Sequence, residues 1–365
     1  MPFHEIVIAV MAAFAVLGAV DRVFGSKLGL GQPFENGILA MGSLAMAMAG
    51  VICLAPVLAA VLKPVVVPVY TFLGADPAMF AGTILACDMG GGPLAEAMTE
   101  NSQAALLGGV ITGSMLGATI VFTIPVSLGI LEEKDRPALA KGILCGIVTI
   151  PVGVLVGGLV AGFPPMMVLR NLIPIVIIAA LIGLGLWKAE KAMIRGFGIF
   201  GTFVVGLITL GLAAGIVEAL TGFAVVPGLA PISESFQTVG TIAIVLAGAF
   251  PLVYLLTKLL KKPLLAFGKV LGINDTAAAG LIASLANSIA TFGMVKDMDD
   301  RGKVVNIAFA VSAAFVFGDH LGFTAGFSPE LLPAVIAGKL AGGVTAVLVA
   351  LGLTRKNVDK AENMG

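Results

Sequence analysis

The chain has 365 residues, of which 59% are hydrophobic and only 12% are charged. A soluble domain carries about a quarter charged residues, so this composition excludes an ordinary soluble protein and predicts a polytopic membrane protein. The formal net charge is zero, which argues against a nucleic-acid-binding protein. Cys53, Cys87 and Cys145 have no CxxC spacing and predict neither a disulfide framework nor a metal site.

Apolar runs long enough for a transmembrane helix recur along the chain, since a span needs about 20 apolar residues. No basic segment precedes the first run, so it is predicted to be a span and not a signal peptide. Two regions, 63–98 and 262–298, are interrupted by proline, glycine and polar residues and predict broken or re-entrant helices. The predicted fold is all-α, with about 11 helical membrane segments. Full spans are predicted at 5–21, 36–62, 103–131, 138–162, 168–187, 197–217, 237–260, 303–323 and 332–353.

The two halves of the chain resemble each other. Residues 42–50, GSLAMAMAG, return as GTIAIVLAG at 240–248, and other matches lie at nearly the same offset. Many transporters are built from such a duplication, with the substrate site between the copies. The predicted organisation is a first transmembrane repeat at 1–165, a linking transmembrane helix and cytoplasmic loop at 166–196, a second repeat at 197–354 and a cytoplasmic tail at 355–365.

Loop charges predict how the repeats are oriented, because basic loops face the cytoplasm. All basic clusters share one side only if both broken regions enter the membrane and return. Loop 21–35 is basic, whereas its copy at 218–236 has no Lys or Arg. Opposite charge in equivalent loops predicts inverted repeats, with the N-terminus outside and the C-terminus in the cytoplasm. Parallel repeats with single broken helices are the alternative, which fits the hydropathy but not the charges.

The stretch 88–98, DMGGGPLAEAM, combines two carboxylates with residues that disfavour a helix. Freed carbonyl groups beside Asp88 and Glu96 would form an oxygen-rich site for a small cation, such as an alkali ion, a proton or an organic ammonium. The alternative is a hairpin tip in which Asp88 caps a half-helix and Glu96 lies in interfacial water. The broken backbone is assigned to Gly90, Gly91, Gly92 and Pro93.

The second broken region places neutral polar groups where the first has carboxylates. Asn287 and Ser288 are predicted to bind a substrate hydroxyl or a sodium ion, with hydrogen bonds between helices as the alternative. Near the end of a long apolar run, Asp319 and His320 form a candidate cation site or proton relay. A water-facing pair at the end of the span is the other interpretation of these two residues.

Roles are also predicted for three further groups of charged residues. Asp21 ends the first span and is a relay candidate, although a structural salt bridge with Arg22 competes with that role. Lys339 lies well inside the last span, where it would neutralise a carboxylate such as Asp319 or extend its ammonium to the surface. The charged runs 132–136 and 296–301 predict solvated loops.

At these residues the chain resembles a known family. GAVDR at 18–22, LGADPAMF at 73–80, LANS at 285–288 and GDHL at 318–321 take part, and DMGG with PLAEAM at 88–98 is the most specific stretch. They resemble the EutH family, ethanolamine permeases of bacterial ethanolamine-utilisation systems, over nearly the whole chain. The resemblance implies a multi-pass transporter of the bacterial inner membrane and no enzyme.

The resemblance also implies a substrate. Ethanolamine is a primary amine that is protonated near neutral pH, as lysine is. We expect Asp88 and Asp319, with Glu96 nearby, to bind its ammonium, and Asn287 and Ser288 to bind its hydroxyl. Rocking of the two halves would alternate access. No metal or cofactor is expected, and the partners are the substrate and membrane lipids; homo-oligomers, and facilitated transport or coupling to Na⁺ or H⁺, are left open.

The main alternative is a cation-coupled symporter of another small polar solute, such as an organic anion. An anion site would normally use an intramembrane Arg or several half-helix N-termini, and no Arg lies in the middle of a predicted span. A channel is disfavoured because the chain has no repeated selectivity filter. An intramembrane enzyme is disfavoured because no P-loop, zinc-ligand cluster or Ser-His arrangement is present in the sequence.

Overall fold

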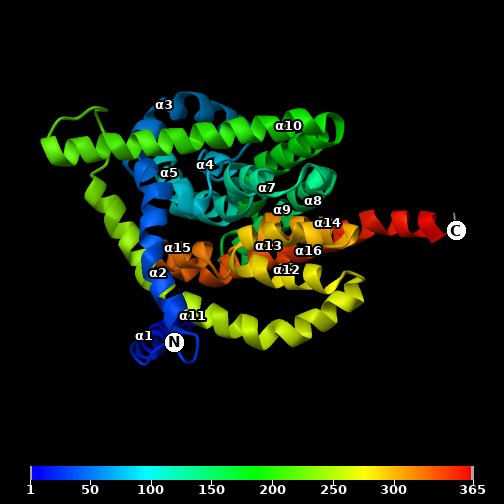
Figure 1. The fold of residues 1–365 in the computed structure, drawn as a ribbon. Coiled ribbons are helices and arrows are strands. Elements are labelled where there is room, and N and C mark those ends of the chain that lie inside the picture. The colour runs from blue at the N-terminus through cyan, green and yellow to red at the C-terminus, as the bar shows by residue number, and fades with distance from the viewer. Residues whose placement is uncertain (1, 363–365) are drawn as a thin grey trace.

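The computed structural model describes residues 2–362, which fold into helices without any strand in this range (Figure 1). Seven helical stretches are long and apolar enough to cross a membrane: His4–Val23, Gly31–Phe72, Ser102–Ile130, Glu133–Val160, Pro165–Thr221, Ile232–Leu259 and Pro329–Thr354. They support a multi-pass membrane protein. The inverted repeats, their boundaries and the larger number of membrane segments stay predictions.

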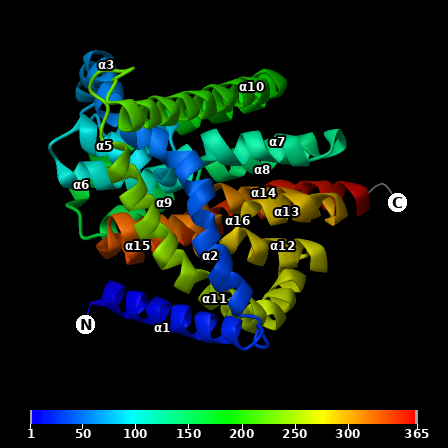
Figure 2. The ribbon, with the colours of Figure 1, turned by 60° about the vertical axis from the view of Figure 1, so that its left-hand side comes forward.

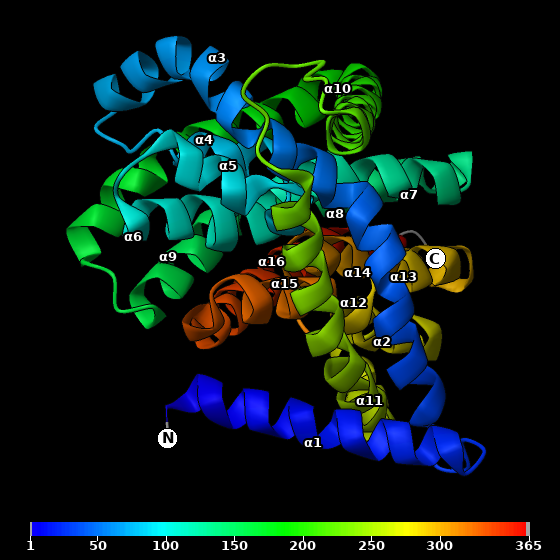
Figure 3. The same cartoon turned by 90° about the vertical axis from the view of Figure 1, so that its left-hand side faces the viewer.

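The N-terminal part consists of two helical stretches. In Figure 3, helix α1 (Phe3–Val23) runs across the bottom of the view, below α2 and α11. The helices α2 (Gly31–Leu44), η1 (Ala45–Ala49) and α3 (Gly50–Phe72) form one stretch of 42 residues. Since α3 continues through Pro64 and Pro68, the expectation that the first break begins at 63 is wrong.

The first broken region, residues 76–99, is a helical hairpin, here called hairpin 1. It consists of α4 (Met79–Ile84), a short extended segment, η2 (Cys87–Met89) and α5 (Gly91–Met98). The hydroxyl of Thr99 donates a hydrogen bond of 3.0 Å to the Asp76 carboxylate, which joins the two ends of the hairpin. The chain therefore enters and leaves this region on the same side.

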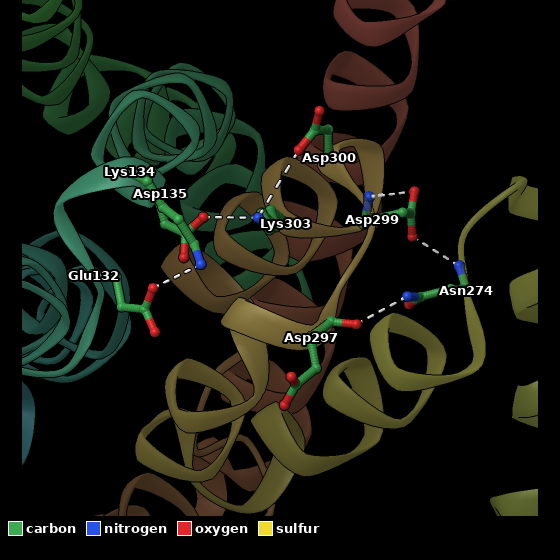
Figure 4. Close-up of polar contacts among 9 residues, drawn as sticks. Glu132, Lys134, Asp135, Asn274, Asp297, Asp299, Asp300 and Lys303 are labelled. Carbon is green, nitrogen blue, oxygen red and sulfur yellow. Dashed lines mark hydrogen bonds and ion pairs between the residues drawn. The ribbon is translucent and has the colours of Figure 1, made fainter.

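The second broken region, residues 274–299, is also a hairpin, here called hairpin 2. The long helix α11 (Ile232–Leu271) runs past the expected break at 262 and ends at Gly272. Helices α12 (Asp275–Ala286), α13 (Ser288–Met294) and η6 (Val295–Asp297) follow. Asn274 bonds to the Asp299 carboxylate at 2.8 Å and to the Asp297 carbonyl at 3.0 Å, so both ends of hairpin 2 also meet (Figure 4).

Each hairpin is followed by a long helical segment, and the two segments differ. After hairpin 1, α6 (Ser102–Ala105), the π-helical η3 (Leu106–Gly117) and η4 (Thr119–Thr123), and α7 (Ile124–Ile130) form one stretch of 29 residues. After hairpin 2, α14 (Asp300–Ala313) stops, and α15 (Asp319–Phe327) begins only after an interruption at 314–318. The predicted full span at 303–323 is therefore wrong.

Tertiary hydrogen bonds explain the interruption at 314–318. The N–H groups of Phe315 and Phe317 donate to the carbonyl oxygens of Ser284 and Leu285, at 3.0 and 2.9 Å. Phe315 has a φ of 62°, which a bulky residue adopts only when its surroundings impose it. The end of α12 in hairpin 2 thus holds the segment that precedes α15.

Two other long helical stretches are interrupted. The predicted span 138–162 consists of α8 (Arg136–Ile147) and α9 (Ile150–Val160). The 57-residue α10 (Pro165–Thr221) has a non-helical residue at Ala189. A Cβ on Gly185 would lie 2.7 Å from the Met193 sulfur, although residues eight apart in a straight helix are about 12 Å apart. The chain therefore turns back at Ala189, in agreement with predicted spans at 168–187 and 197–217.

The last helix, α16 (Leu332–Glu362), follows the short η7 (Pro329–Leu331). In Figure 2 the start of α1 and the end of α16 lie on opposite sides of the molecule. This is the arrangement that termini on opposite membrane sides would require.

Glycines allow unusually close packing in two places. Hairpin 1 packs on η3 so closely that a Cβ on Gly82 would overlap the Gly108 carbonyl, and a Cβ on Gly117 would overlap the Leu85 carbonyl. Helix α3 packs on α10 in the same way, because a Cβ on Gly50 would overlap the Ile208 carbonyl. Small residues permit such backbone contact between membrane helices.

A charged cluster joins the two halves away from these contacts (Figure 4). Lys303 of α14 forms an ion pair of 2.7 Å with Asp135 of η5 (Glu133–Asp135), whose side chain is only 2% exposed. The expectation of a solvated loop is therefore wrong for Asp135. Lys134 and Glu132 pair at 2.7 Å close by, but their side chains are 64% and 50% exposed.

Candidate functional site

A cavity of about 610 Å³ lies between hairpin 1, α15, the α2–η1 junction, the η4–α7 segment and the second part of α10. Three of the predicted site residues line it: Asp88 from the tip of hairpin 1, and Asp319 and His320 from the first turn of α15. The rest of its wall is mainly apolar. The structure thus brings together residues that are more than 200 positions apart in the chain.

The tip of hairpin 1 positions Asp88. Gly90 has a φ of 90°, and a Cβ there would overlap the side chain of Val51. The Ala86 carbonyl accepts the N–H groups of Met89 and Gly91, at 3.0 and 2.9 Å. The carbonyl of Gly90 accepts from Leu94. The carbonyls of Ala86 and Gly90 therefore already accept hydrogen bonds, whereas the sequence predicts freed carbonyls beside Asp88.

The break also lies earlier than predicted. Gly90 is at the break, but Gly91, Gly92 and Pro93 form the first turn of α5. Proline is tolerated there because N–H groups in the first turn have no partner within the helix. A Cβ on Gly92 would lie 2.9 Å from the ring of Phe323, so this glycine allows α5 to approach α15. Asp88 does not cap α5, whose N-terminus has no side-chain cap.

A chain of three polar side chains begins at Asp88. His320 Nε2 lies 3.5 Å from the Asp88 carboxylate, and His320 Nδ1 lies 3.0 Å from Nζ of Lys339 in α16. Lys339 also donates to the carbonyl oxygen of Ser114 in η3. Its side chain is 1% exposed, so it does not extend to the surface, which was one of the two expectations. Within the described residues it also does not pair directly with Asp319, which was the other.

The hydrogen-bond network assigns the tautomer of His320. An ammonium can only donate, so Nδ1 must accept from Lys339 and the ring proton must lie on Nε2, facing Asp88. The ring thereby connects an ammonium and a carboxylate that do not touch. Within the described residues, Lys339 has no carboxylate partner of its own.

Asp319 has a different environment. It is the first residue of α15 and partly exposed to the cavity. Within the described part of the chain, its carboxylate takes part in no hydrogen bond or ion pair. The cavity wall therefore holds one carboxylate that has a partner and one that has none among the described residues.

The remaining predicted substrate residues lie outside the cavity lining. Glu96 is exposed on α5. Asn287 caps α13, where its side chain accepts the Ile289 N–H at 2.8 Å. Ser288 is fully buried, and its hydroxyl has no partner among the described residues.

Asp21 also lies apart from the cavity. Its carboxylate accepts the N–H groups of Leu28, Leu30 and Gly31 at 2.8, 2.8 and 2.9 Å. These bonds hold the turn that leads into α2. Arg22 pairs with Glu35 at 3.1 Å and not with Asp21.

A metal ion could be considered at Cys87, Asp88 and His320, whose ligand atoms lie within 4.8 Å of one another. A metal-bound histidine normally donates its second ring N–H to an acceptor. Here the second nitrogen, Nδ1, faces the Lys339 ammonium, which is a donor. The surroundings of His320 therefore fit a ring placed between an ammonium and a carboxylate and not a metal centre.

The family model described as "Ethanolamine utilisation protein, EutH" matches residues 3–353, nearly the entire chain. The chain belongs to the EutH family. This confirms the resemblance found in the sequence.

Curated relatives match the EutH-family chain over almost their full lengths. The protein named "Probable ethanolamine permease EutH" of Listeria monocytogenes is 57% identical over 99% of this chain and 96% of its own. A protein of the same name from Escherichia coli is 49% identical over 98% of this chain and 97% of its own. Protein YxeR of Bacillus subtilis is 51% identical over 97% and 96%. No solved structure matches.

The cavity of this EutH-family chain also contains residues that sequence reasoning missed. Thr202 and Thr209 of α10 line it, and each hydroxyl donates to the carbonyl four residues earlier, which leaves oxygen lone pairs free. Their spacing of two helical turns was a signal for a shared face. The rings of Phe122 and Phe315 also line the cavity, 5.3 Å apart, and Phe315 lies 5.2 Å from His320.

Proposed function

We propose that this protein is a permease that carries ethanolamine across the membrane as the protonated amine. The single observation that supports this best is the pair of carboxylates, Asp88 and Asp319, in the wall of a mainly apolar cavity. A buried carboxylate is costly unless it meets a positive charge, and the ammonium of ethanolamine supplies one. Family membership and the names of the relatives support the same substrate.

The binding mode differs in part from the one expected from the sequence. The ammonium would lie between Asp88 and Asp319, next to the face of Phe315, where a cation is attracted to the ring. Asn287 and Ser288 do not line the cavity, so the hydroxyl is assigned to Thr202 and Thr209 instead. Access would alternate between the two sides by movement of the repeats against each other.

An organic-anion symporter is the weaker candidate. The cavity presents two carboxylates and no Lys or Arg among its lining residues. An anion would be repelled by this surface, and the ammonium of Lys339, which lies nearby, is already bonded to His320 and Ser114. The naming of the relatives as permeases also favours a transporter over an enzyme.

Uptake of labelled ethanolamine into proteoliposomes tests the proposal. Asp88→Asn removes one charged partner of the ammonium, and a hydrogen bond to a charged group contributes about 1.5–3 kcal/mol. We expect uptake at low substrate to fall about 10- to 100-fold. Glu100→Gln, the same charge change in an exposed loop, serves as the matched control and should behave as wild type. Wild-type uptake by Asp88→Asn would remove Asp88 from the site.

A further inference from the structure

The charges around the cavity do not balance. The titratable groups that face it or each other are Cys87 and Asp88 on η2, Asp319 and His320 on α15, and Lys339 on α16. The η3 segment contributes only the Ser114 carbonyl to this group, and α10 contributes hydroxyls. With His320 neutral, two carboxylates stand against one ammonium.

The excess negative charge of the cavity can be assigned to one residue. Asp88 is connected to Lys339 through the His320 ring, with contacts of 3.5 and 3.0 Å, so its charge is compensated. Asp319 has no partner in the described protein. An uncompensated carboxylate in a mainly apolar cavity is unfavourable, most of all when the cavity is closed to water on both sides.

Two species can neutralise Asp319, namely the ammonium of the cargo or a proton from water. Each brings the cavity to zero net charge, and both together would leave it with an excess positive charge. Cargo and proton should therefore exclude each other. A cavity that holds neither the cargo nor the proton would keep a net negative charge. The protein would then pass slowly through the state in which the cavity is closed on both sides.

We propose that this permease exchanges one protonated amine for one proton, with Asp319 as the residue that carries the proton. The inference rests on the proposed function, since it concerns the same cavity. Facing outward, Asp319 releases its proton to water and the ammonium takes its place. Facing inward, the ammonium leaves and the Asp319 carboxylate takes a proton from the cytoplasm. The net process moves one positive charge in each direction and is electrically neutral.

Proteoliposomes separate this exchange from simple movement of the cation. A tenfold K⁺ gradient with valinomycin makes the interior negative at equal pH, and a cation uniporter would then accumulate labelled ethanolamine about tenfold. The exchanger should show no accumulation. In a second experiment the potential is clamped at zero and the interior is more acidic by one pH unit. The exchanger should then raise the initial rate of ethanolamine uptake above that of protein-free liposomes, and the accumulation should approach about tenfold.

The outcomes can be distinguished. Accumulation driven by the potential at equal pH would overturn the exchange but leave an ethanolamine permease. Absence of protein-dependent counterflow, measured at equal pH without a potential, would overturn the proposed function and the exchange with it. A requirement for a sodium gradient would also contradict proton exchange.

Asp319→Asn tests the assignment of the proton. This change leaves Asp88 balanced by Lys339, so the empty cavity is already neutral and needs no proton. Uptake should weaken, and the uptake that remains at high substrate should become driven by the potential. If the variant still responds to the pH gradient and not to the potential, Asp319 is not the proton carrier. Glu100→Gln is again the matched control and should keep the wild-type pattern.

Discussion

At the scale of single residues, His320 connects two charges that would otherwise be isolated. Lys339 is almost fully buried, and a buried ammonium without partners is expensive. The ring nitrogen that accepts from Lys339 obliges the other nitrogen to present its proton to Asp88. The tautomer of His320, and with it the ring proton that faces Asp88, therefore depends on one lysine in α16.

A pair of substitutions at His320 tests this connection. Gln can accept from Lys339 with its carbonyl oxygen and donate to Asp88 with its amide, whereas Leu can do neither. We expect His320→Gln to keep uptake within about threefold of wild type and His320→Leu to lower it by about tenfold or more. Equal loss in both variants would show that the hydrogen bonds of the ring are not what matters.

Gly90 offers a second prediction at this scale. A residue with a side chain would have to adopt a left-handed backbone conformation here, and its Cβ would also overlap Val51. Gly90→Ala should lower the free energy of unfolding by about 1–2 kcal/mol or more and should displace Asp88, so uptake falls as well. Thermal unfolding in detergent measures the first effect. Gly129→Ala, at a helical glycine with open space around it, is the control and should not destabilise the protein.

At the scale of helices and hairpins, the tips of the two hairpins contribute in different ways. Hairpin 1 supplies a side chain to the cavity, Asp88. Hairpin 2 supplies backbone carbonyls, which bind the interrupted segment before α15 and thereby position Asp319 and His320. The polar side chain of Asn287 serves the helix geometry of hairpin 2 itself.

The ion pair between Lys303 and Asp135 connects elements from the two halves. Removing one partner of a buried pair leaves the other charge uncompensated, at a cost of about 3–5 kcal/mol. We therefore expect Lys303→Met to lower thermal stability clearly. Lys134→Met breaks an exposed pair in the same loop and should change stability by less than about 1 kcal/mol. Similar stability of the two variants would contradict the structural role of Lys303.

At the scale of the whole molecule, the predicted orientation can be tested at the ends of the hairpins. Glu100 follows hairpin 1 and Lys296 lies at the end of hairpin 2, and both are exposed. Inverted repeats place them on opposite membrane sides. In intact cells, a membrane-impermeant maleimide should label Glu100→Cys and should label Lys296→Cys only after permeabilisation. The parent protein is the control, since its three cysteines are buried.

Labelling of both positions from outside would contradict the inverted arrangement. It would favour the parallel repeats that fit the hydropathy equally well. The result does not depend on the substrate, so it tests the architecture alone.

Much of this architecture was predictable from the sequence, because long apolar runs and Pro or Gly interruptions report directly on membrane helices. The break near Asp88 could also be inferred, and Asp319 and His320 could be selected as candidate site residues, because charges inside apolar segments are rare. The interruption at 314–318 could not. Its residues, AFVFG, continue an apolar run, and only hydrogen bonds to a distant hairpin stop the helix.

The composition of the site was harder to predict than the location of its charges. Asn287 has the chemistry to bind a hydroxyl, but capping a helix uses the same oxygen. The place of Lys339 depends on how α16 is rotated against η3, which a single sequence does not report. The contribution of α10 depends on the turn at Ala189, which brings Thr202 and Thr209 back to the cavity.

The glycine contacts have a mechanical consequence. Where backbone meets backbone, there is no side chain whose rotation could absorb a shift, so hairpin 1 and η3 form one stiff block, and α3 and α10 form another. Asp88 belongs to the first block, and Thr202 and Thr209 belong to the second. These two blocks also touch, because the side chain of Val51 in α3 fills the space beside Gly90 next to Asp88, so glycine contacts set the width of the cavity on this side.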